Sequence, residues 1–347
     1  MPARRSRPSK PAKPLSDHIA VVAGATRGAG RGIARALAEA GATVYCTGRS
    51  VTGQPSPYGR PETIQETADL ITAQGGVAIP VRVDHTVESE VRAFFTRIEK
   101  DHGRLDILAN SVAGQDPMMA QWASFWKTDL TNGEAILRQA LLSHIITAKY
   151  AAPLMIRRRR GLIVEVTESD MLMAGGNVLV QAVKLSLKGL VVSMASDLRK
   201  HRIAAIAITP GFLRSEMMLE NFGVTEANWR DAGKKDKNFL ESETPLFVGR
   251  AVAALAQDPH VLDRSGDLVS SWQLGREYGF TDVDGHRPDW GRLKMELPPA
   301  MAAWFLDELR RHADWMRSLS RRTDRYLALQ TKPERAEPRK PRRRARR

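Results

Sequence analysis

Three glycines and the residues between them form the stretch with the clearest chemistry. Gly24, Gly28 and Gly30 stand in the order Gly-Ala-Thr-Arg-Gly-Ala-Gly, with Thr26 and Arg27 between the first two. Glycine lets the backbone turn sharply and lets a pyrophosphate approach the peptide N–H groups, because no Cβ intervenes. These residue types at this spacing predict a cradle for the phosphates of a dinucleotide.

The cradle requires a strand before it and a helix after it, and the flanking sequence predicts both. Ile19–Ala23 is a short apolar run, rich in β-branched residues, that is typical of a buried strand. Ile33 and Leu37 fall at helical spacing, and Gly41 is positioned to end that helix. The start of such a helix presents unpaired N–H groups and a partial positive charge to phosphates. This context favours the cradle over the alternative of an ordinary glycine-rich loop.

Short apolar strands alternate with helical stretches along most of the chain. The expected strands are residues 19–23, 42–46, 77–83, 105–110, 162–167, 203–208 and 267–271. The expected helices after the first are residues 62–74, 87–102 and 133–160, and one that opens at Pro245. Such alternation predicts one doubly wound α/β domain (Rossmann type), with a parallel sheet of about seven strands and helices on both faces.

The Gly-x-x-x-Gly-x-Gly spacing resembles the short-chain dehydrogenase/reductase family, and the resemblance covers roughly residues 15 to 275. Asn110-Ser111-Val112-Ala113-Gly114 is similar to the family's Asn-Asn-Ala-Gly with one residue inserted. Thr209-Pro210-Gly211 resembles the family's turn beside the nicotinamide. The resemblance implies cofactor contacts at Asp84, Asn110, Pro210, Gly211 and Ser215, with Asp84 at the adenine and Ser215 near the cofactor amide.

Arginines near the end of the second strand favour NADP(H) over NAD(H). An NAD-binding strand usually ends in an acid that binds the ribose 2′-hydroxyl, whereas an arginine suits a 2′-phosphate. No acid stands at this strand end; Arg49 follows it, and Arg27 lies in the glycine loop. The alternative is that both arginines are simply solvated.

The family's catalytic residues are matched at one position of four. The resembled family uses a tyrosine as acid/base, a lysine four residues later, a serine after the fifth strand and an asparagine one helix earlier. Lys184 matches the lysine, but Val180, Glu168 and Ala140 stand at the other three positions. One helical turn would place the lysine ammonium beside the phenol, where it lowers the phenol pKa and holds the nicotinamide ribose. The resemblance implies that Lys184 binds cofactor and takes part in catalysis, with an atypical or weakened proton-transfer site.

Glu168 leaves two alternatives open. A carboxyl at an apolar strand end can have a raised pKa and could replace the missing acid. Alternatively, Glu168 pairs with Lys184 or an arginine and does no chemistry. The first alternative predicts an oxidoreductase that uses NADP(H) on a carbonyl or alcohol. The second predicts a non-catalytic NADP(H)-binding sensor or scaffold.

Two loops are candidates to contact a small-molecule substrate. The first contains Met118, Met119, Trp122, Phe125 and Trp126, and either lines an apolar substrate pocket or caps the core. The polar segment from residue 216 to 243 stands where the resembled family carries its substrate lid. Residues 275–297 are expected to be irregular.

The net charge of +14 belongs mainly to the two ends of the chain. Residues 1–14 carry five cations and no acid, and residues 332–347 carry nine cations and two acids, which leaves +2 for the remainder. Both ends are rich in proline and cannot bury enough surface to fold, so we expect disordered tails at 1–14 and 331–347. The tails are either functionally quiet or adhere to nucleic acid or another anionic surface.

The region between the tails is expected to hold a dinucleotide-binding domain at 15–296 and a helical extension at 297–330. Met301, Phe305 and Leu309 begin an apolar stripe at helical spacing in that extension. The stripe either packs on the body or a neighbouring subunit, or lies on a membrane surface, which acids such as Asp307 disfavour.

Cysteine usage and hydropathy indicate the setting of the protein. Cys46 is the only cysteine, so neither a disulfide framework nor a cysteine-based metal site is expected, and we expect no metal. No apolar run reaches the roughly 18 residues of a membrane span, and no signal-peptide core follows the first residues. These features predict a cytoplasmic protein. The resembled family is usually dimeric or tetrameric, which implies a homo-oligomer.

Overall fold

The computed structural model describes residues 13–56, 58–113, 124–128, 130–131, 133–168, 177–295, 307 and 310–311. The chain divides into two units, Met1–Leu293 and Lys294–Arg347. The first unit contains the sheet and the predicted site. In the second unit the described residues 307, 310 and 311 are helical, and Arg311 pairs with Asp307 at 3.1 Å, one turn away. The expected domain boundaries stay a prediction, and both tails and most of the C-terminal extension lie outside the described residues.

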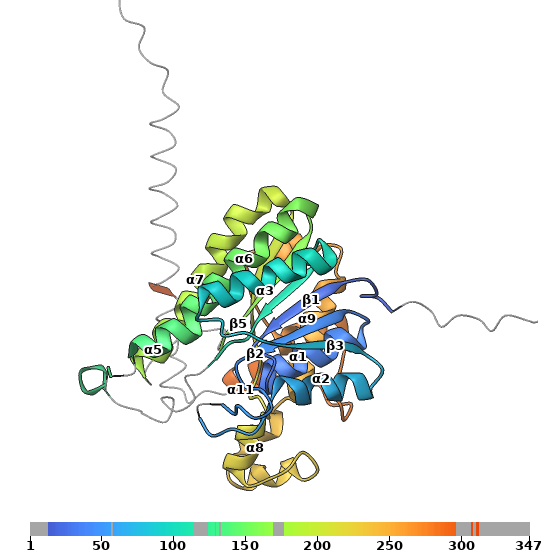
Figure 1. Ribbon diagram of the computed structural model, residues 1–347. Helices are drawn as coiled ribbons and strands as arrows, with labels where there is room; N and C mark the ends of the chain where they lie inside the picture. Colours follow the sequence, from blue (N-terminus) through green and yellow to red (C-terminus); the bar gives the residue numbers. More distant parts are fainter. Residues whose placement is uncertain are drawn as a thin grey trace, which may run out of the picture. The chain divides into compact units, whose positions relative to one another are not determined.

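Seven parallel strands form one sheet in the order β3-β2-β1-β4-β5-β6-β7 (Figure 1). The strands are β1 (Ile19–Ala23), β2 (Thr43–Gly48), β3 (Val77–Arg82), β4 (Ile107–Asn110), β5 (Gly161–Val166), β6 (Ile203–Thr209) and β7 (Leu268–Ser270). The predicted doubly wound sheet is therefore confirmed. The strand order reverses between β1 and β4, and folds of this kind bind ligands at the carboxyl ends of the strands at that point.

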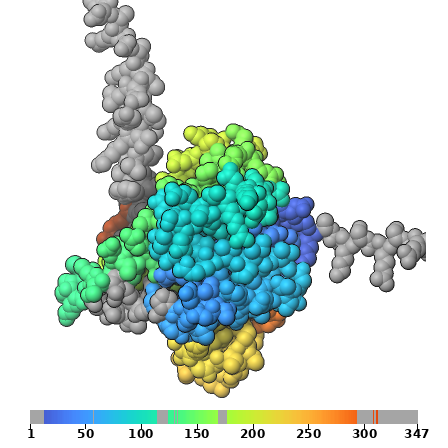
Figure 2. Space-filling model, viewed as in Figure 1, coloured from blue at the N-terminus to red at the C-terminus, as the bar shows by residue number. Residues whose placement is uncertain are grey.

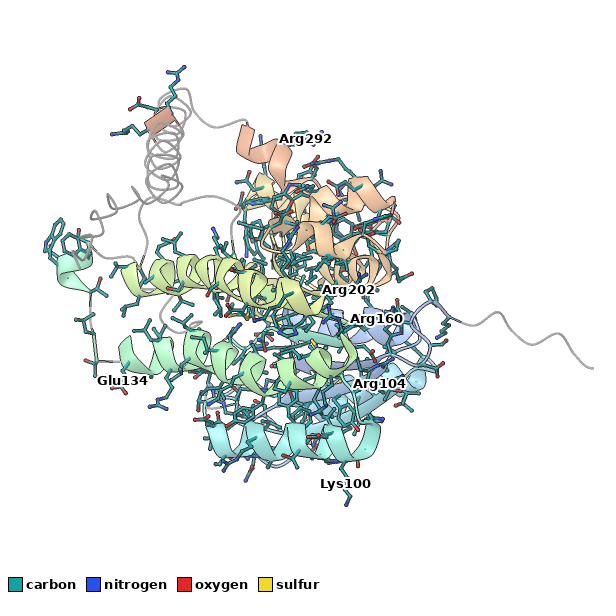
Figure 3. The ribbon with its side chains drawn as sticks, turned by 90° about the horizontal axis from the view of Figure 1, so that it is seen from above. Lys100, Arg104, Glu134, Arg160, Arg202 and Arg292 are labelled. Atoms are coloured by element: carbon teal, nitrogen blue, oxygen red, sulfur yellow. The ribbon has the colours of Figure 1, made fainter. Side chains whose placement is uncertain are left out.

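Helices cover both faces of the sheet because every central strand is apolar on both sides. Along β1, Ala20 and Val22 face one core while Ile19 and Val21 face the other. The first core is covered by α1 (Gly28–Glu39), α2 (Ile64–Ala73), α9 (Pro245–Gln257) and α10 (Ser271–Tyr278). The second is covered by α3 (Glu88–His102), α6 (Ser143–Arg158) and α7 (Val178–Leu198), which lie side by side in Figure 3.

Local sequence explains where several helices begin and end. Thr63 caps α2 by accepting a hydrogen bond from the Glu66 amide at 3.1 Å, and Asn177 caps α7 in the same way. Helix α3 ends at Gly103, whose φ of +66° suits glycine. Figure 3 shows Arg104 after α3, Arg160 after α6 and Arg202 shortly after α7. These arginines lie at the edge of the sheet where β4, β5 and β6 begin. The predicted site lies at the opposite edge.

One expectation about helices was confirmed and another was wrong. The segment expected to be helical from 133 to 160 is helical from Gly133 to Arg158, as α5 (Gly133–Leu137), a π-helical turn at Arg138–Leu142 and α6. Residues 275–297 are not wholly irregular, since they contain the end of α10 and also α11 (Trp290–Met295). The Ser270 hydroxyl caps α10 by accepting a hydrogen bond from the Gln273 amide. This serine is a local sign of a helix start that the sequence analysis did not use.

The polar segment from 216 to 243 is folded around a small apolar cluster of its own. It contains α8 (Glu216–Phe222) and two 3₁₀ turns, η4 (Trp229–Lys234) and η5 (Lys237–Glu241). Trp229, Ala232 and Phe239 are buried together. The other 3₁₀ turns are η1 (Phe125–Lys127), η3 (Arg199–His201) and η6 (Val261–Arg264).

Among the described residues, one helix is long and apolar enough to cross a membrane, Val178–His201, with a mean hydropathy of 1.6. It escaped the sequence criterion because Lys184 and Lys188 interrupt the apolar run. Its buried residues pack on the sheet beside β6. A core helix of an α/β fold passes the same test, so length and hydropathy alone do not indicate a span here.

Candidate active site

A cavity of about 310 Å³ opens at the carboxyl ends of the central strands. It brings together residues from the glycine turn and from the loops after β2, β3, β4, β5 and β6. Of the predicted site residues, Gly24, Thr26, Arg27, Gly28, Arg49, Asp84, Glu168, Lys184, Pro210 and Ser215 line it. Gly30, Asn110 and Gly211 do not line it, and each occupies a supporting position instead.

The glycine turn has the geometry of a phosphate cradle. Gly24 and Gly28 have φ values of +82° and +52°, which glycine adopts without strain. A Cβ on Gly24 would lie 2.5 Å from the carbonyl oxygen of Ser111, and one on Gly30 would lie 2.0 Å from that of Gly24. Gly24 and Gly30 are therefore required by close packing, while a Cβ on Gly28 would meet nothing closer than 3.7 Å. A turn of this shape, at the start of a helix, has the features that bind a dinucleotide phosphate in folds of this class.

Each arginine predicted to bind the 2′-phosphate lies near a carboxylate. An Arg49 guanidinium nitrogen is 3.8 Å from an Asp84 carboxylate oxygen. Burial opposes ionisation of Glu62, but its hydrogen bond with Arg60 and the positive field of Arg27 leave its pKa lowered. The sequence showed no acid at the end of β2, yet the fold brings Asp84 and Glu62 to this place from β3 and from the loop before α2.

Asn110 takes part in a buried polar cluster beneath the cavity wall. Its Nδ2 donates to Glu165 Oε1 at 2.8 Å, and Glu165 Oε2 lies 2.5 Å from His144 Nδ1. The other ring nitrogen of His144 lies 2.9 Å from the carbonyl oxygen of Val112, next to the cavity. Burial alone would lower the pKa of His144, but the Glu165 carboxylate and these hydrogen bonds raise it. The cluster holds the backbone after β4 in place.

His85 lies beside this cluster and lines the cavity. It is fully buried, and its two ring nitrogens each lie 2.8 Å from a threonine hydroxyl, of Thr47 and Thr147. Burial and then the charge of His144 lower the pKa of His85 to about 3. His85 is therefore a neutral, hydrogen-bonded part of the cavity wall near neutral pH.

The catalytic positions are filled by one ion pair and two apolar side chains. Lys184 pairs directly with Glu168, whose side chain is 47% exposed, against 10% for the lysine. This contact agrees with the alternative in which Glu168 neutralises Lys184. Val180 and Ala140 are buried, and Ala140 packs with Ile136 and other apolar residues in the π-helical turn. Neither can exchange a proton.

The Pro210–Gly211 turn is held by a buried acid that the sequence analysis missed. Glu243 Oε2 accepts hydrogen bonds from the Gly211 amide at 2.8 Å and from the Ser271 hydroxyl at 2.5 Å. Burial raises the pKa of Glu243 to about 8. Ser215, the predicted partner of the cofactor amide, lines the cavity and caps α8 by accepting from the Met218 amide.

Other polar residues at or beneath the cavity escaped the sequence analysis for different reasons. Glu165 left a signal, since it is the one charge in the apolar strand Leu-Ile-Val-Glu-Val. His144 and Glu216 left none, because their partners are far away in sequence.

The apolar loop after β4 is only partly described. Met118, Met119 and Trp122 lie outside the described residues. Phe125 and Trp126 are 70% and 71% exposed and contact each other edge to face, so these two side chains do not cap the core. Among the residues that the structure describes, no group of three His, Cys, Asp or Glu side chains is placed to hold a metal ion.

A doubly wound parallel sheet with a glycine cradle at its switch point defines the class of Rossmann-type dinucleotide-binding folds. The sequence profile described as short chain dehydrogenase matches residues 18–223 of this chain. The protein therefore belongs to the short-chain dehydrogenase/reductase family, whose members are oxidoreductases that use nicotinamide cofactors.

Known proteins of this family align over most of the chain. "Dehydrogenase/reductase SDR family member 1" of Homo sapiens is 35% identical over 278 residues, covering 79% of this chain and 86% of that protein. A 3-oxoacyl-[acyl-carrier-protein] reductase of Bos taurus is 29% identical over 250 residues, covering 71% and 93%. The crystal structure of a hydroxysteroid dehydrogenase from Escherichia coli superposes with a TM-score of 0.59 at 22% identity, covering 74% and 95%, and confirms the fold.

Proposed function

We propose that this protein is a short-chain-type oxidoreductase that uses NADP(H) in preference to NAD(H) on a carbonyl or alcohol substrate, with an atypical or weakened proton-transfer site. The observation that carries the proposal is the cavity in which the glycine cradle, Arg27, Arg49 and Lys184 meet. Guanidinium groups favour a 2′-phosphate because they donate several charge-assisted hydrogen bonds to it.

Several residues that line the cavity have a proposed role toward one part of the dinucleotide. The cradle amides would hold the diphosphate, Arg27 and Arg49 the 2′-phosphate, and Asp84 the adenine. Ser215 would bind the nicotinamide amide, and Lys184 the nicotinamide ribose. Asn110, Pro210 and Gly211 would support this arrangement through the backbone next to them. Bound NADPH supplies a hydride to a substrate carbonyl carbon.

The reduced carbonyl oxygen also needs a proton, and Val180 cannot give one. Lys184 and Glu168 are the titratable pair on the cavity wall in this region. Because the Glu168 side chain is 47% exposed, the pair can exchange protons with solvent. A positioned general acid contributes about 10²–10⁴-fold to a rate, so we expect slow turnover from this substitute arrangement.

A non-catalytic NADP(H)-binding sensor or scaffold is the second candidate. It is favoured by Val180 and Ala140, which are buried apolar residues at two catalytic positions, and by the neutralisation of Lys184 by Glu168. Both candidates require the dinucleotide, and only the first requires turnover.

Calorimetry with NADPH and NADH, followed by NADPH oxidation at ~340 nm over a broad carbonyl panel, tests the proposal. We expect tighter binding of NADPH than of NADH, and slow carbonyl-dependent oxidation that Lys184→Met abolishes. Lys149→Met, on the exposed surface of α6, is the matched control and should leave both unchanged.

The outcomes separate the two candidates. Binding without turnover, together with activity created by the double change Val180→Tyr and Glu168→Ser, supports the sensor. Absence of binding of either dinucleotide at millimolar concentration rules out both. Turnover that survives Lys184→Met contradicts the proposed site.

We also infer a cytoplasmic homo-oligomer. The lone Cys46 is buried, which suits a reducing compartment. Apolar side chains lie exposed on α6 and α7, where a second copy would cover them.

A further inference from the structure

A carboxylate of the protein itself lies in the phosphate cradle. Glu216, the first residue of α8, accepts a hydrogen bond through Oε2 from the Gly28 amide at 2.9 Å. Its Oε1 lies 3.2 Å from Nη1 of Arg31. Gly28 is the first residue of α1, so its N–H points out of the positive end of that helix. Both oxygens of Glu216 thus contact groups that would attract a phosphate.

Arg31 is held rigidly in a position to bind an anion. Its side chain is 10% exposed, and its Nη2 donates to the Thr26 carbonyl at 2.8 Å and to Glu66 at 2.9 Å. The Nε group donates to the hydroxyl of Thr67 at 3.1 Å. Glu66 also accepts from Nη1 at 3.3 Å, so the guanidinium is fixed and is shared between two carboxylates. Arg31 Nη1 and the Gly28 amide form a preorganised anion seat, and Glu216 occupies it.

A second acid anchors α8 on the other side of the cleft. Glu220 lies one turn after Glu216, on the same face of the helix. Its Oε1 accepts from Nη2 of Arg60 at 3.1 Å, and Arg60 belongs to the loop between β2 and α2. Met217 and Met218 of α8 line the cavity. Figures 1 and 2 show the gold segment that contains α8 lying against the blue segment around β2 and its loop.

We propose that Glu216 is an internal competitor for the dinucleotide: its carboxylate occupies the seat of a cofactor phosphate and latches α8 over the cleft. This inference rests on the proposed function. A phosphate that enters the seat must displace Glu216 or lie against its negative charge, and either event weakens binding. Glu216 therefore sets the affinity for the cofactor and ties the position of α8 to occupancy of the cradle.

Calorimetry with NADPH, and separately with inorganic pyrophosphate, tests the competitor. Glu216→Gln keeps an oxygen that can accept from Gly28 but removes the charge, so the seat stays intact. We expect Glu216→Gln to bind NADPH at least about tenfold more tightly than the wild type, and to bind pyrophosphate where the wild type binds it weakly. Glu216→Ala should also bind more tightly, since it removes the carboxylate altogether.

Glu277→Gln is the matched control, because Glu277 pairs with Arg264 at 2.7 Å on the surface and does not line the cavity. Its NADPH affinity should equal that of the wild type. If wild type binds NADPH and neither Glu216 variant binds it more tightly, Glu216 is not a competitor, while the proposed function stands. If no variant binds NADPH, the proposed function fails, and the competitor with it.

Discussion

His144 and Glu165 form a buried pair in the polar cluster that also contains Asn110. Both side chains are fully buried, and their nearest polar atoms are 2.5 Å apart. The two ring nitrogens of His144 face a carboxylate oxygen and a carbonyl oxygen, and this arrangement favours the protonated ring, which donates to both. Removing one member of such a pair leaves an uncompensated buried group, whereas removing both does not.

We expect His144→Leu and Glu165→Leu each to lower the free energy of unfolding by about 3 kcal/mol or more. The double variant should recover part of that loss, because neither member is then left without its partner. The recovery should be incomplete, since Asn110 loses its acceptor on Glu165. Denaturant unfolding of the four proteins measures both effects. The exposed pair Lys149–Glu88 links α6 to the first residue of α3 and provides a control double-mutant cycle with a much smaller coupling.

The pair His144–Glu165 should also make the free energy of unfolding depend on pH. The pKa of His144 is raised in the folded protein, so its stabilising contribution is complete below the ordinary value of 6.5 and is lost as the pH rises through the folded value. His144→Leu should abolish this loss. Additive single-variant effects in the cycle would contradict an interaction between the two side chains.

At the scale of elements, the segment that carries α8 begins and ends at one place, because residues at its start pair with Glu243 at its end. Leu213 and Glu243 form an isolated parallel bridge, with the Arg214 amide donating to the Glu243 carbonyl at 2.7 Å. The Glu243 side chain continues this connection to Gly211 and Ser271. Its Oε1 is buried and has no hydrogen-bond partner among the described residues. A neutral carboxyl is therefore favoured there.

This environment of Glu243 predicts that the protein becomes less stable as the pH rises from acid to about 8. The pKa of Glu243 is raised from 4.5 to about 8, so between these values the folded protein holds a proton that the unfolded chain releases. The free energy of unfolding therefore falls as the pH rises from 4.5 to 8. Glu243→Gln mimics the neutral acid and should remove this part of the decline. Urea unfolding between about pH 5 and 9 measures it.

The surface variant Glu277→Gln should retain the wild-type pH profile in the same experiment. A Glu243→Gln profile parallel to that of the wild type would show that Glu243 ionises normally in the folded state.

At the scale of the whole molecule, exposed apolar side chains form a stripe on α7 next to others on α6. Val178, Leu185 and Val192 are spaced seven residues apart, and so share one helix face. Leu142 lies in the π-helical turn and Ile145 on α6, and both are exposed as well. Exposed apolar side chains that recur on one helix face favour an interface there.

We expect Leu185→Glu combined with Val192→Glu to dissociate the oligomer, because burying two carboxylates against a second copy is costly. Sedimentation velocity of both proteins measures the change. Val283→Glu, at another exposed valine, is the control and should leave the assembly intact. A wild-type protein that sediments as a monomer at micromolar concentration would contradict the interface.

Much of this protein could be predicted from local patterns. Apolar strands alternating with helical stretches predicted the seven-stranded sheet, and the glycine spacing predicted the cradle, because each depends on residues close together in the chain. The bounds of the helical segment before β5 were predicted to within two residues, but its π-helical turn was not. Ala140 in that turn packs with residues of α7, which are distant in the sequence.

The sequence by itself determined the fold class, the glycine cradle and the absence of a tyrosine at position 180, since these are properties of single positions and short spacings. Only the tertiary structure decided which group each carboxylate meets: Glu168 meets Lys184, Glu165 meets His144, and Glu216 meets the Gly28 amide. Electrostatic interactions depend on distance in space, and Glu216 and Gly28 are 188 residues apart in the chain. No local pattern carries that information, because folding alone brings those two segments together.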